Sequence, residues 1–97
     1  MSVSGGHSTS AELVRLREDI EAIDQELVRL LARRVRLARA VGAAKRAADL
    51  PTLDPAREAA VVRRAAELAR ESGLCEDDVR RIFWHLIGIS RRAQMED

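Results

Sequence analysis

Two cations lie on the apolar face of a long predicted helix. Apolar residues recur every three or four positions between residues 13 and 41, which is the spacing of one helix face. Between Leu30 and Leu37, this spacing assigns an apolar residue to position 34, but Arg34 occupies it. Lys45 shares the face of Arg34, because it follows eleven positions later and eleven residues turn a helix by about 1100°, close to three full turns. Inward cations are costly without an anionic partner, so the chemistry expected here is anion binding.

Polar residues also interrupt the apolar stripes of two later predicted helices. Glu58 lies on the stripe of the second helix, and Ser90 and Gln94 lie on that of the third. Taken singly, each has an ordinary explanation, such as an ion pair between Arg34 and Glu58 or solvation at a helix end. Their coincidence on three helices favours a shared pocket instead. A pocket with more cations than carboxylates suits an anionic ligand.

The first helix is too long for a compact monomer. A capping signature at Thr9 opens it and the Asp49–Pro51 break ends it, so its roughly 38 residues span about 57 Å. Gly42 is interpreted as a tolerated weak point that costs about 1 kcal/mol. Because a compact chain of this size is only about 32 Å across, we expect a homodimer in which the long helices pair. Arg17 lies about 26 Å from Arg34 along the axis, so it cannot serve the Arg34 site of its own chain. In an antiparallel dimer it could reach the partner's site, whereas taken alone it is an ordinary solvated surface arginine.

The second and third helices are shorter and have recognisable ends. Asp54 followed by Pro55 is an N-terminal capping signature, and Gly73 is a typical left-handed stop after residue 72. The third helix is predicted to begin near Glu76. Cys75, at the position before it, is a poor capping residue.

Composition limits the classes of function. The 97 residues are 46% hydrophobic and 34% charged with few strand formers, which predicts an all-α fold in one domain. A net charge of +1 argues against nucleic-acid or membrane partners, and no apolar run approaches the roughly 20 residues of a membrane span. The single Cys75 and two histidines provide no metal-ligand spacing and fit a cytoplasmic setting. Residues 1–9 are expected to form a disordered tail and residues 10–97 the domain. Trp84 and His85 have no triad partners and are assigned no chemistry.

With these residues in place, the chain resembles the all-helical class of chorismate mutase, the small intertwined-dimer type. The resemblance runs without gaps from about Leu16 to Gln94. The segments that carry it are LRE at 16–18, Asp24, LLARR at 30–34, VG at 41–42 with Lys45, Pro51, DPARE at 54–58, and IF at 82–83 through Ser90 to Gln94. Cys75 and Ala43 depart from that pattern, since a better cap and a basic residue are usual there.

The resemblance implies a fold and a reaction. The fold would be three helices per chain in an intertwined homodimer whose long first helices cross, with two active sites and no cofactor or metal. The reaction would be the rearrangement of chorismate, a small dicarboxylate, to prephenate. Arg34, with Arg17 from the other subunit, would bind the two carboxylates. Lys45 and Gln94 would donate hydrogen bonds to the enol-ether oxygen.

Four further positions complete the implied site. Glu58, with the Asp54 region, would bind the ring hydroxyl, and Arg57 and Ser90 would complete the anion-binding shell. Other functions stay open on the same scaffold: a 4-amino-4-deoxychorismate mutase, an isochorismate-pyruvate lyase, or a weakly active module that works with or regulates a shikimate-pathway partner enzyme. A helical dimerisation domain without a ligand is the simplest alternative.

Overall fold

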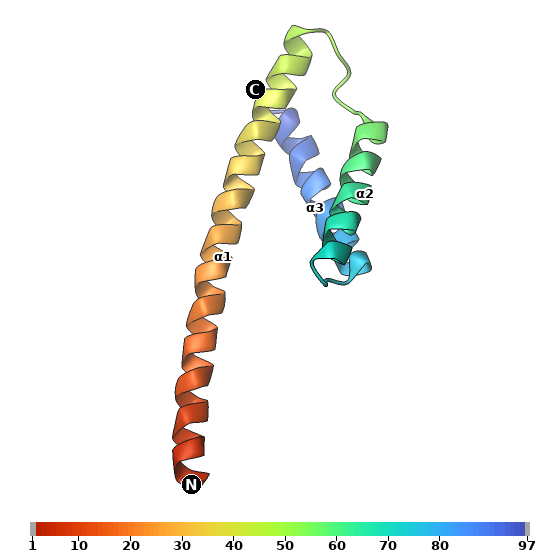
Figure 1. The fold of residues 1–97 in the computed structure, drawn as a ribbon. Coiled ribbons are helices and arrows are strands. Elements are labelled where there is room, and N and C mark those ends of the chain that lie inside the picture. The colour runs from red at the N-terminus through yellow and green to blue at the C-terminus, as the bar shows by residue number, and fades with distance from the viewer. Residues whose placement is uncertain (1, 97) are drawn as a thin grey trace. The chain divides into compact units, whose positions relative to one another are not determined.

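The computed structural model describes residues 2–96, with side chains described from Thr9 onward. Over this range the chain forms three helices and no strand: α1 (Ser2–Ala47), α2 (Pro55–Glu71) and α3 (Glu76–Gln94) (Figure 1). The predicted all-α class is therefore confirmed. None of the described helices combines the length and apolar character needed to cross a membrane. The chain divides within α1 into two compact units, Met1–Arg33 and Arg34–Asp97.

The first unit is the N-terminal part of α1. The helix extends back to Ser2, ahead of the capping signature at Thr9, because no proline stops it and each added residue gains a backbone hydrogen bond. Met1 lies outside the described residues, and the predicted disorder of residues 1–9 in solution stays a prediction. The apolar stripe of this unit is uncovered: Leu16, Ile23 and Leu27 are 52–58% exposed.

The second unit begins with the C-terminal part of α1, which ends where the sequence predicts. Asp49 adopts a left-handed conformation with φ 55°. The Leu50 amide donates to the Lys45 carbonyl at 2.9 Å, and the Asp49 amide donates to the Arg46 carbonyl at 3.2 Å. This pair of bonds is the Schellman motif, and aspartate tolerates the left-handed position that glycine usually takes. The turn places Lys45 on the last turn of α1.

The ends of α2 follow the predicted signals. Asp54 Oδ1 accepts a hydrogen bond from the Arg57 amide at 3.1 Å, and Pro55 occupies the first helical position. At the other end Gly73 has φ 74°, and the Leu74 amide donates to the Ala69 carbonyl at 2.8 Å. Both capping predictions are confirmed. The Asp54 cap fixes the start of α2, and Glu58 follows one turn later.

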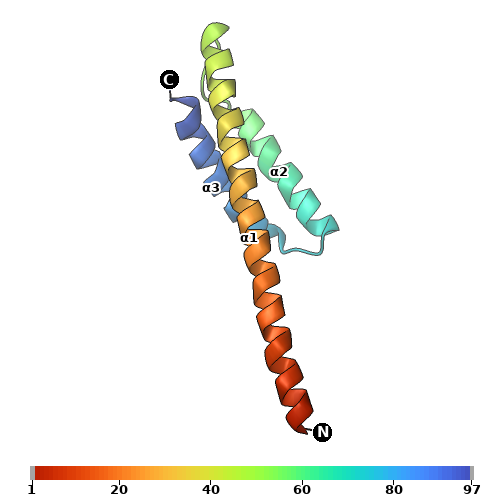
Figure 2. The same cartoon turned by 90° about the vertical axis from the view of Figure 1, so that its left-hand side faces the viewer.

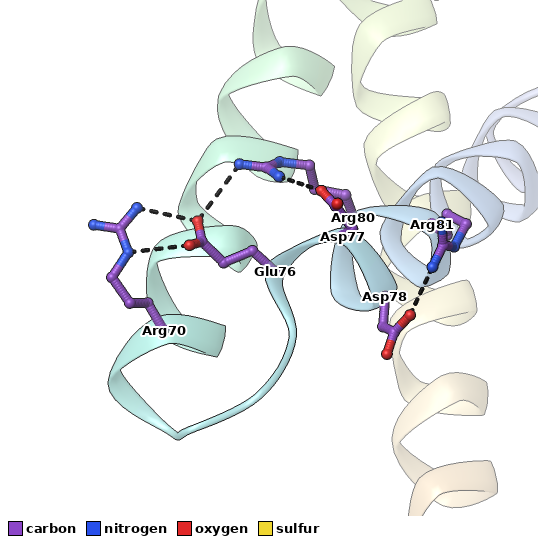
Figure 3. Close-up of polar contacts among 6 residues, drawn as sticks. All are labelled: Arg70, Glu76, Asp77, Asp78, Arg80 and Arg81. Atoms are coloured by element: carbon purple, nitrogen blue, oxygen red, sulfur yellow. Dashed lines mark hydrogen bonds and ion pairs between the residues drawn. The ribbon is translucent and has the colours of Figure 1, made fainter.

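Carboxylates rather than a side-chain cap stabilise the start of α3. Cys75 makes no side-chain capping bond, as its type predicts. Glu76 instead accepts two hydrogen bonds from Arg70 of α2, at 3.0 and 3.2 Å, and contacts Arg80 one turn on (Figure 3). The Arg70 guanidinium holds the pKa of the Glu76 carboxyl below its ordinary value. The negative charge of Glu76 interacts favourably with the dipole of α3, and its hydrogen bonds with Arg70 link α2 to α3.

Small side chains form the core of the second unit. Its buried hydrophobic residues are Ala38 of α1, Val62, Ala65, Ala66 and Ala69 of α2, and Ile87 and Ala93 of α3. Helices α2 and α3 pack against each other. The end of α3 lies beside the last part of α1 in both views (Figure 1 and Figure 2). A Cβ added to Gly42 would lie 2.2 Å from the Gln94 carbonyl oxygen. Gly42 is therefore a point of backbone-to-backbone contact, and its interpretation as a merely tolerated weak point is wrong.

Candidate active site

A cavity of about 500 Å³ opens in the second unit, within the 300–1,000 Å³ range typical of small-molecule sites. The last part of α1, α2 and α3 all contribute to its wall, together with apolar side chains such as Leu37, Val61 and Ile87. Seven of the eight residues predicted from the sequence line it: Arg34, Lys45, Asp54, Arg57, Glu58, Ser90 and Gln94. Polar groups from three helices therefore share one cavity, as their positions on the stripes suggested.

Arg34 reaches from α1 to α3. Its Nη1 donates to the Ser90 hydroxyl oxygen and, at 3.4 Å, to the Leu86 carbonyl oxygen. Among the side chains that the structure describes, residues 9–96, Arg34 forms no ion pair, so the suggested pairing with Glu58 is wrong for this structure. Two neutral acceptors orient the guanidinium and leave its positive charge uncompensated on the cavity wall.

Lys45 and Gln94 form a second polar pair across the same helices. Lys45 Nζ donates to Gln94 Oε1 and to the Thr52 carbonyl oxygen, each at 2.8 Å. An ammonium group has three donors and no acceptor, so the amide oxygen of Gln94 must face Lys45. The amide NH₂ group of Gln94 and the third ammonium proton of Lys45 remain as donors for a ligand. The pair thus presents two donors to a ligand acceptor.

Glu58 is paired with a residue that sequence reasoning did not identify. Arg91 of α3 donates to both carboxylate oxygens of Glu58, from Nε at 2.7 Å and from Nη2 at 2.5 Å. The Glu58 side chain is only 14% exposed. The Arg91 hydrogen bonds outweigh the effect of burial and, with the charge of Lys45, hold the pKa of Glu58 below its ordinary value. Glu58 is therefore an ionised, fixed acceptor.

Two arginines of α1 hold the end of α3. Arg46 donates to the Gln94 carbonyl oxygen at 2.7 Å and to the Glu96 carbonyl oxygen at 3.1 Å. Arg39 forms an ion pair with the Glu96 carboxylate. Cations suit a helix C-terminus, where the last carbonyl groups lack partners within the helix. The sequence shows both arginines, but only the packing of α1 on α3 identifies what they bind.

The charges on the cavity wall favour an anion. The cavity is lined by three cations, Arg34, Lys45 and Arg57, and by two carboxylates, Asp54 and Glu58. The Asp54 carboxylate caps α2, and a further arginine pairs with Glu58, so the positive charge is in excess. The eighth predicted residue, Arg17, is exposed on the first unit and does not line this cavity.

Comparison with known proteins gives the family. The family model described as chorismate mutase type II matches residues 16–95. A chorismate mutase of Methanocaldococcus jannaschii is 31% identical over 88% of this chain and 86% of its own length. A bifunctional chorismate mutase/prephenate dehydratase of Aquifex aeolicus is 40% identical over 62% of this chain, and the T-protein of Enterobacter agglomerans is 41% identical over 75%. The matches span only 17% and 21% of those two relatives. With a family match that covers most of the sequence, the chain belongs to the chorismate mutase type II family.

Proposed function

We propose that this protein is a chorismate mutase, an isomerase that converts chorismate to prephenate. The observation that carries the proposal is the single cavity in which polar groups of three helices meet with excess positive charge. Chorismate is a dianion with two carboxylates, an ether oxygen and a ring hydroxyl. The cavity offers cations, donors and an ionised acceptor for these groups. Membership of the family supports the same substrate.

The groups have separate parts in binding. We assign one substrate carboxylate to Arg34, whose guanidinium is held by Ser90, with Arg57 adding positive charge on the α2 side. Glu58 accepts a hydrogen bond from the ring hydroxyl, and Asp54 keeps the start of α2 in place beside it. Binding at both ends of the substrate holds the conformer in which the bond-forming carbon atoms approach each other. Orientation of this kind can lower a barrier by several kcal/mol.

Lys45 and Gln94 act on the reacting bond. The rearrangement is pericyclic: the ether C–O bond breaks as a new C–C bond forms, with no nucleophile, general base or cofactor in the scheme. Negative charge develops on the ether oxygen as the C–O bond lengthens. The Gln94 amide and the free ammonium proton of Lys45 are placed together by their own hydrogen bond and donate to that oxygen. One such preorganised donor is worth about 3–4 kcal/mol.

The complete site takes Arg17 from a second subunit. The uncovered stripe of the first unit, with Ile20, Ile23 and Leu27 each 57–58% exposed, supports a homodimer in which these faces are buried. The partner subunit's Arg17 then binds the second carboxylate of the substrate. Of the two guanidinium groups proposed for the dicarboxylate, the cavity of a single chain holds only that of Arg34.

The test is direct assay of chorismate loss and prephenate formation by the purified protein. Lys45→Ala removes a preorganised donor and should lower kcat about 100–1,000-fold, and Arg34→Ala should raise KM and lower kcat. Arg36→Ala is the matched control, since Arg36 is an exposed residue of the same helix outside the cavity. Circular dichroism should show that all three variants are folded. Folded Lys45 and Arg34 variants with full rates would contradict the site assignment.

A second candidate is a mutase module that works with a partner enzyme. It is supported by the relative from Aquifex aeolicus, a bifunctional chorismate mutase/prephenate dehydratase of which this chain matches 17%. On this hypothesis the isolated chain converts chorismate slowly. Adding a shikimate-pathway enzyme should then raise its rate, whereas an unchanged rate favours an independent enzyme.

A further inference from the structure

Arg91 closes the outer side of Glu58 while the cavity lies on its inner side. Arg91 is 47% exposed on its side chain and does not line the cavity, whereas Glu58 is 14% exposed and does. Both carboxylate oxygens accept a hydrogen bond from the same guanidinium, at 2.5 and 2.7 Å. This two-point geometry fixes the plane of the carboxylate as well as its position. A carboxylate has about four lone-pair directions, so acceptor capacity remains toward the cavity.

We propose that Arg91 is a specificity-determining and positioning residue: it fixes Glu58 as a charge-compensated acceptor, so that the cavity selects a neutral hydroxyl over an ammonium group at this point of the substrate. The inference rests on the proposed function and deepens it. The Arg91–Glu58 pair would thereby distinguish chorismate from 4-amino-4-deoxychorismate, which carries an amine in place of the ring hydroxyl. Arg91 acts through Glu58 and does not itself touch the substrate.

The electrostatic argument compares the two ligand groups. An unpaired carboxylate attracts an ammonium group strongly, because both are charged and partly desolvated. Once Arg91 has compensated Glu58, the ammonium group meets little net negative charge, and Lys45 and Arg57 on the same wall repel it. A hydroxyl loses nothing by this compensation, since it needs only a lone pair in the right direction. The pair therefore penalises the amine and keeps the hydroxyl contact.

No other carboxylate on the described cavity wall takes over the role of Glu58. Asp54, the second carboxylate there, is exposed and its Oδ1 caps α2. The charged groups that line the same cavity are Arg34 and Lys45 from α1 and Asp54 and Arg57 from α2, and Arg91 approaches from α3. Four cations therefore surround Glu58, against one other carboxylate, Asp54, on the described cavity wall, and this excess of positive charge favours a neutral donor.

The first experiment measures kcat/KM for chorismate and for 4-amino-4-deoxychorismate. Arg91→Met should lower the ratio that favours chorismate by about tenfold or more, through a gain in binding of the amine. Arg92→Met removes the same charge from the next residue, which is exposed, and should leave the ratio unchanged. Arg91→Lys keeps the charge but not the two-point geometry and should give an intermediate ratio. An unchanged ratio in folded Arg91→Met, or an equal change in Arg92→Met, would overturn the proposal.

The second experiment needs no activity and separates this inference from the proposed function. The Glu58 carboxyl carbon is followed by NMR through a pH titration of the ligand-free protein. In Arg91→Met, burial acts without the opposing hydrogen bonds, so Glu58 should become protonated at a higher pH than in the wild type or in Arg92→Met. Equal titration curves would show that Arg91 does not hold Glu58. A wild type that titrates as expected but converts neither substrate would refute the proposed function alone.

Discussion

At the residue scale, the pairing of Lys45 with Gln94 determines how the rate should depend on pH. An amide donates a hydrogen bond at any pH, so we expect no rise in the wild-type rate toward acid between about pH 5 and 8. Gln94→Glu replaces the amide with a group that donates only when protonated. Beside Lys45 the ionised form of the new carboxyl is favoured, so the neutral-pH rate should fall about 100-fold and recover as the pH is lowered.

The control for this prediction is Gln25→Glu, the same substitution at an exposed position of the first unit. It should leave both the rate and its pH dependence unchanged. Steady-state kcat at several pH values measures the effect. A wild-type rate that falls steeply between pH 5 and 8 would contradict the assigned donor role of a neutral Gln94.

Individual residues of the candidate site differ in how well the sequence identifies them. Arg34 and Glu58 could be found because each breaks an apolar stripe, and a break in periodicity is a local signal. Arg91 could not, because its pairing with Glu58 joins positions 33 apart and depends on how α3 is rotated against α2. Arg91 and Arg92 look alike in the sequence. Only the packing shows which of them reaches the carboxylate.

At the element scale, contact between α1 and α3 depends on Gly42. A Cβ on Gly42 would lie 2.2 Å from the Gln94 carbonyl oxygen and 2.7 Å from its Cα, so Gly42→Ala must push the end of α3 away. That displacement should lower both stability and turnover, although alanine gains about 1 kcal/mol of helix propensity. Gln94 would lose its position beside Lys45.

Gly88→Ala provides the matched comparison within α3. A Cβ there would have Arg92 Nη1 as its nearest neighbour, at 3.8 Å, which is an ordinary contact distance. This variant should therefore gain about 0.5–1 kcal/mol of stability from helix propensity and keep its turnover. Thermal unfolding and the mutase assay on both variants test the contrast. Equal stability changes in the two variants would show that α1 and α3 do not meet at Gly42.

Helix ends were more predictable than helix contacts. Asp54 and Gly73 act through hydrogen bonds to residues within a few positions, and Cys75 makes no side-chain capping bond, so the behaviour of all three follows from the local sequence. The start of α1 does not follow from the local sequence, because the capping signature at Thr9 competes with a helix that continues back to Ser2. Gly42 shows the same limit. Helix propensity gives its local cost, but its benefit comes from the backbone of α3.

At the scale of the whole molecule, exposed apolar surface on the first unit argues for association. Leu13, Leu16, Ile20, Ile23, Leu27 and Leu30 are each 45–58% exposed. Full burial of one such side chain stabilises by about 1.5–3 kcal/mol, so covering this stripe is worth far more than a few hydrogen bonds. We therefore expect light scattering at micromolar concentration to give the mass of a dimer.

Mixing two inactive variants then tests whether the site is shared between subunits. Arg17→Ala and Arg34→Ala homodimers each lack one guanidinium in both sites. In a heterodimer, the Arg34 of one chain meets the Arg17 of the other in one intact site, and the second site lacks both. After joint unfolding and refolding, random pairing makes half of the dimers mixed, so activity should recover to about a quarter of the wild-type value. Refolding each variant alone should restore no activity. A mixture that stays inactive would place Arg17 and Arg34 in the same subunit's site, and an Arg17→Ala homodimer with full activity would place Arg17 outside any site.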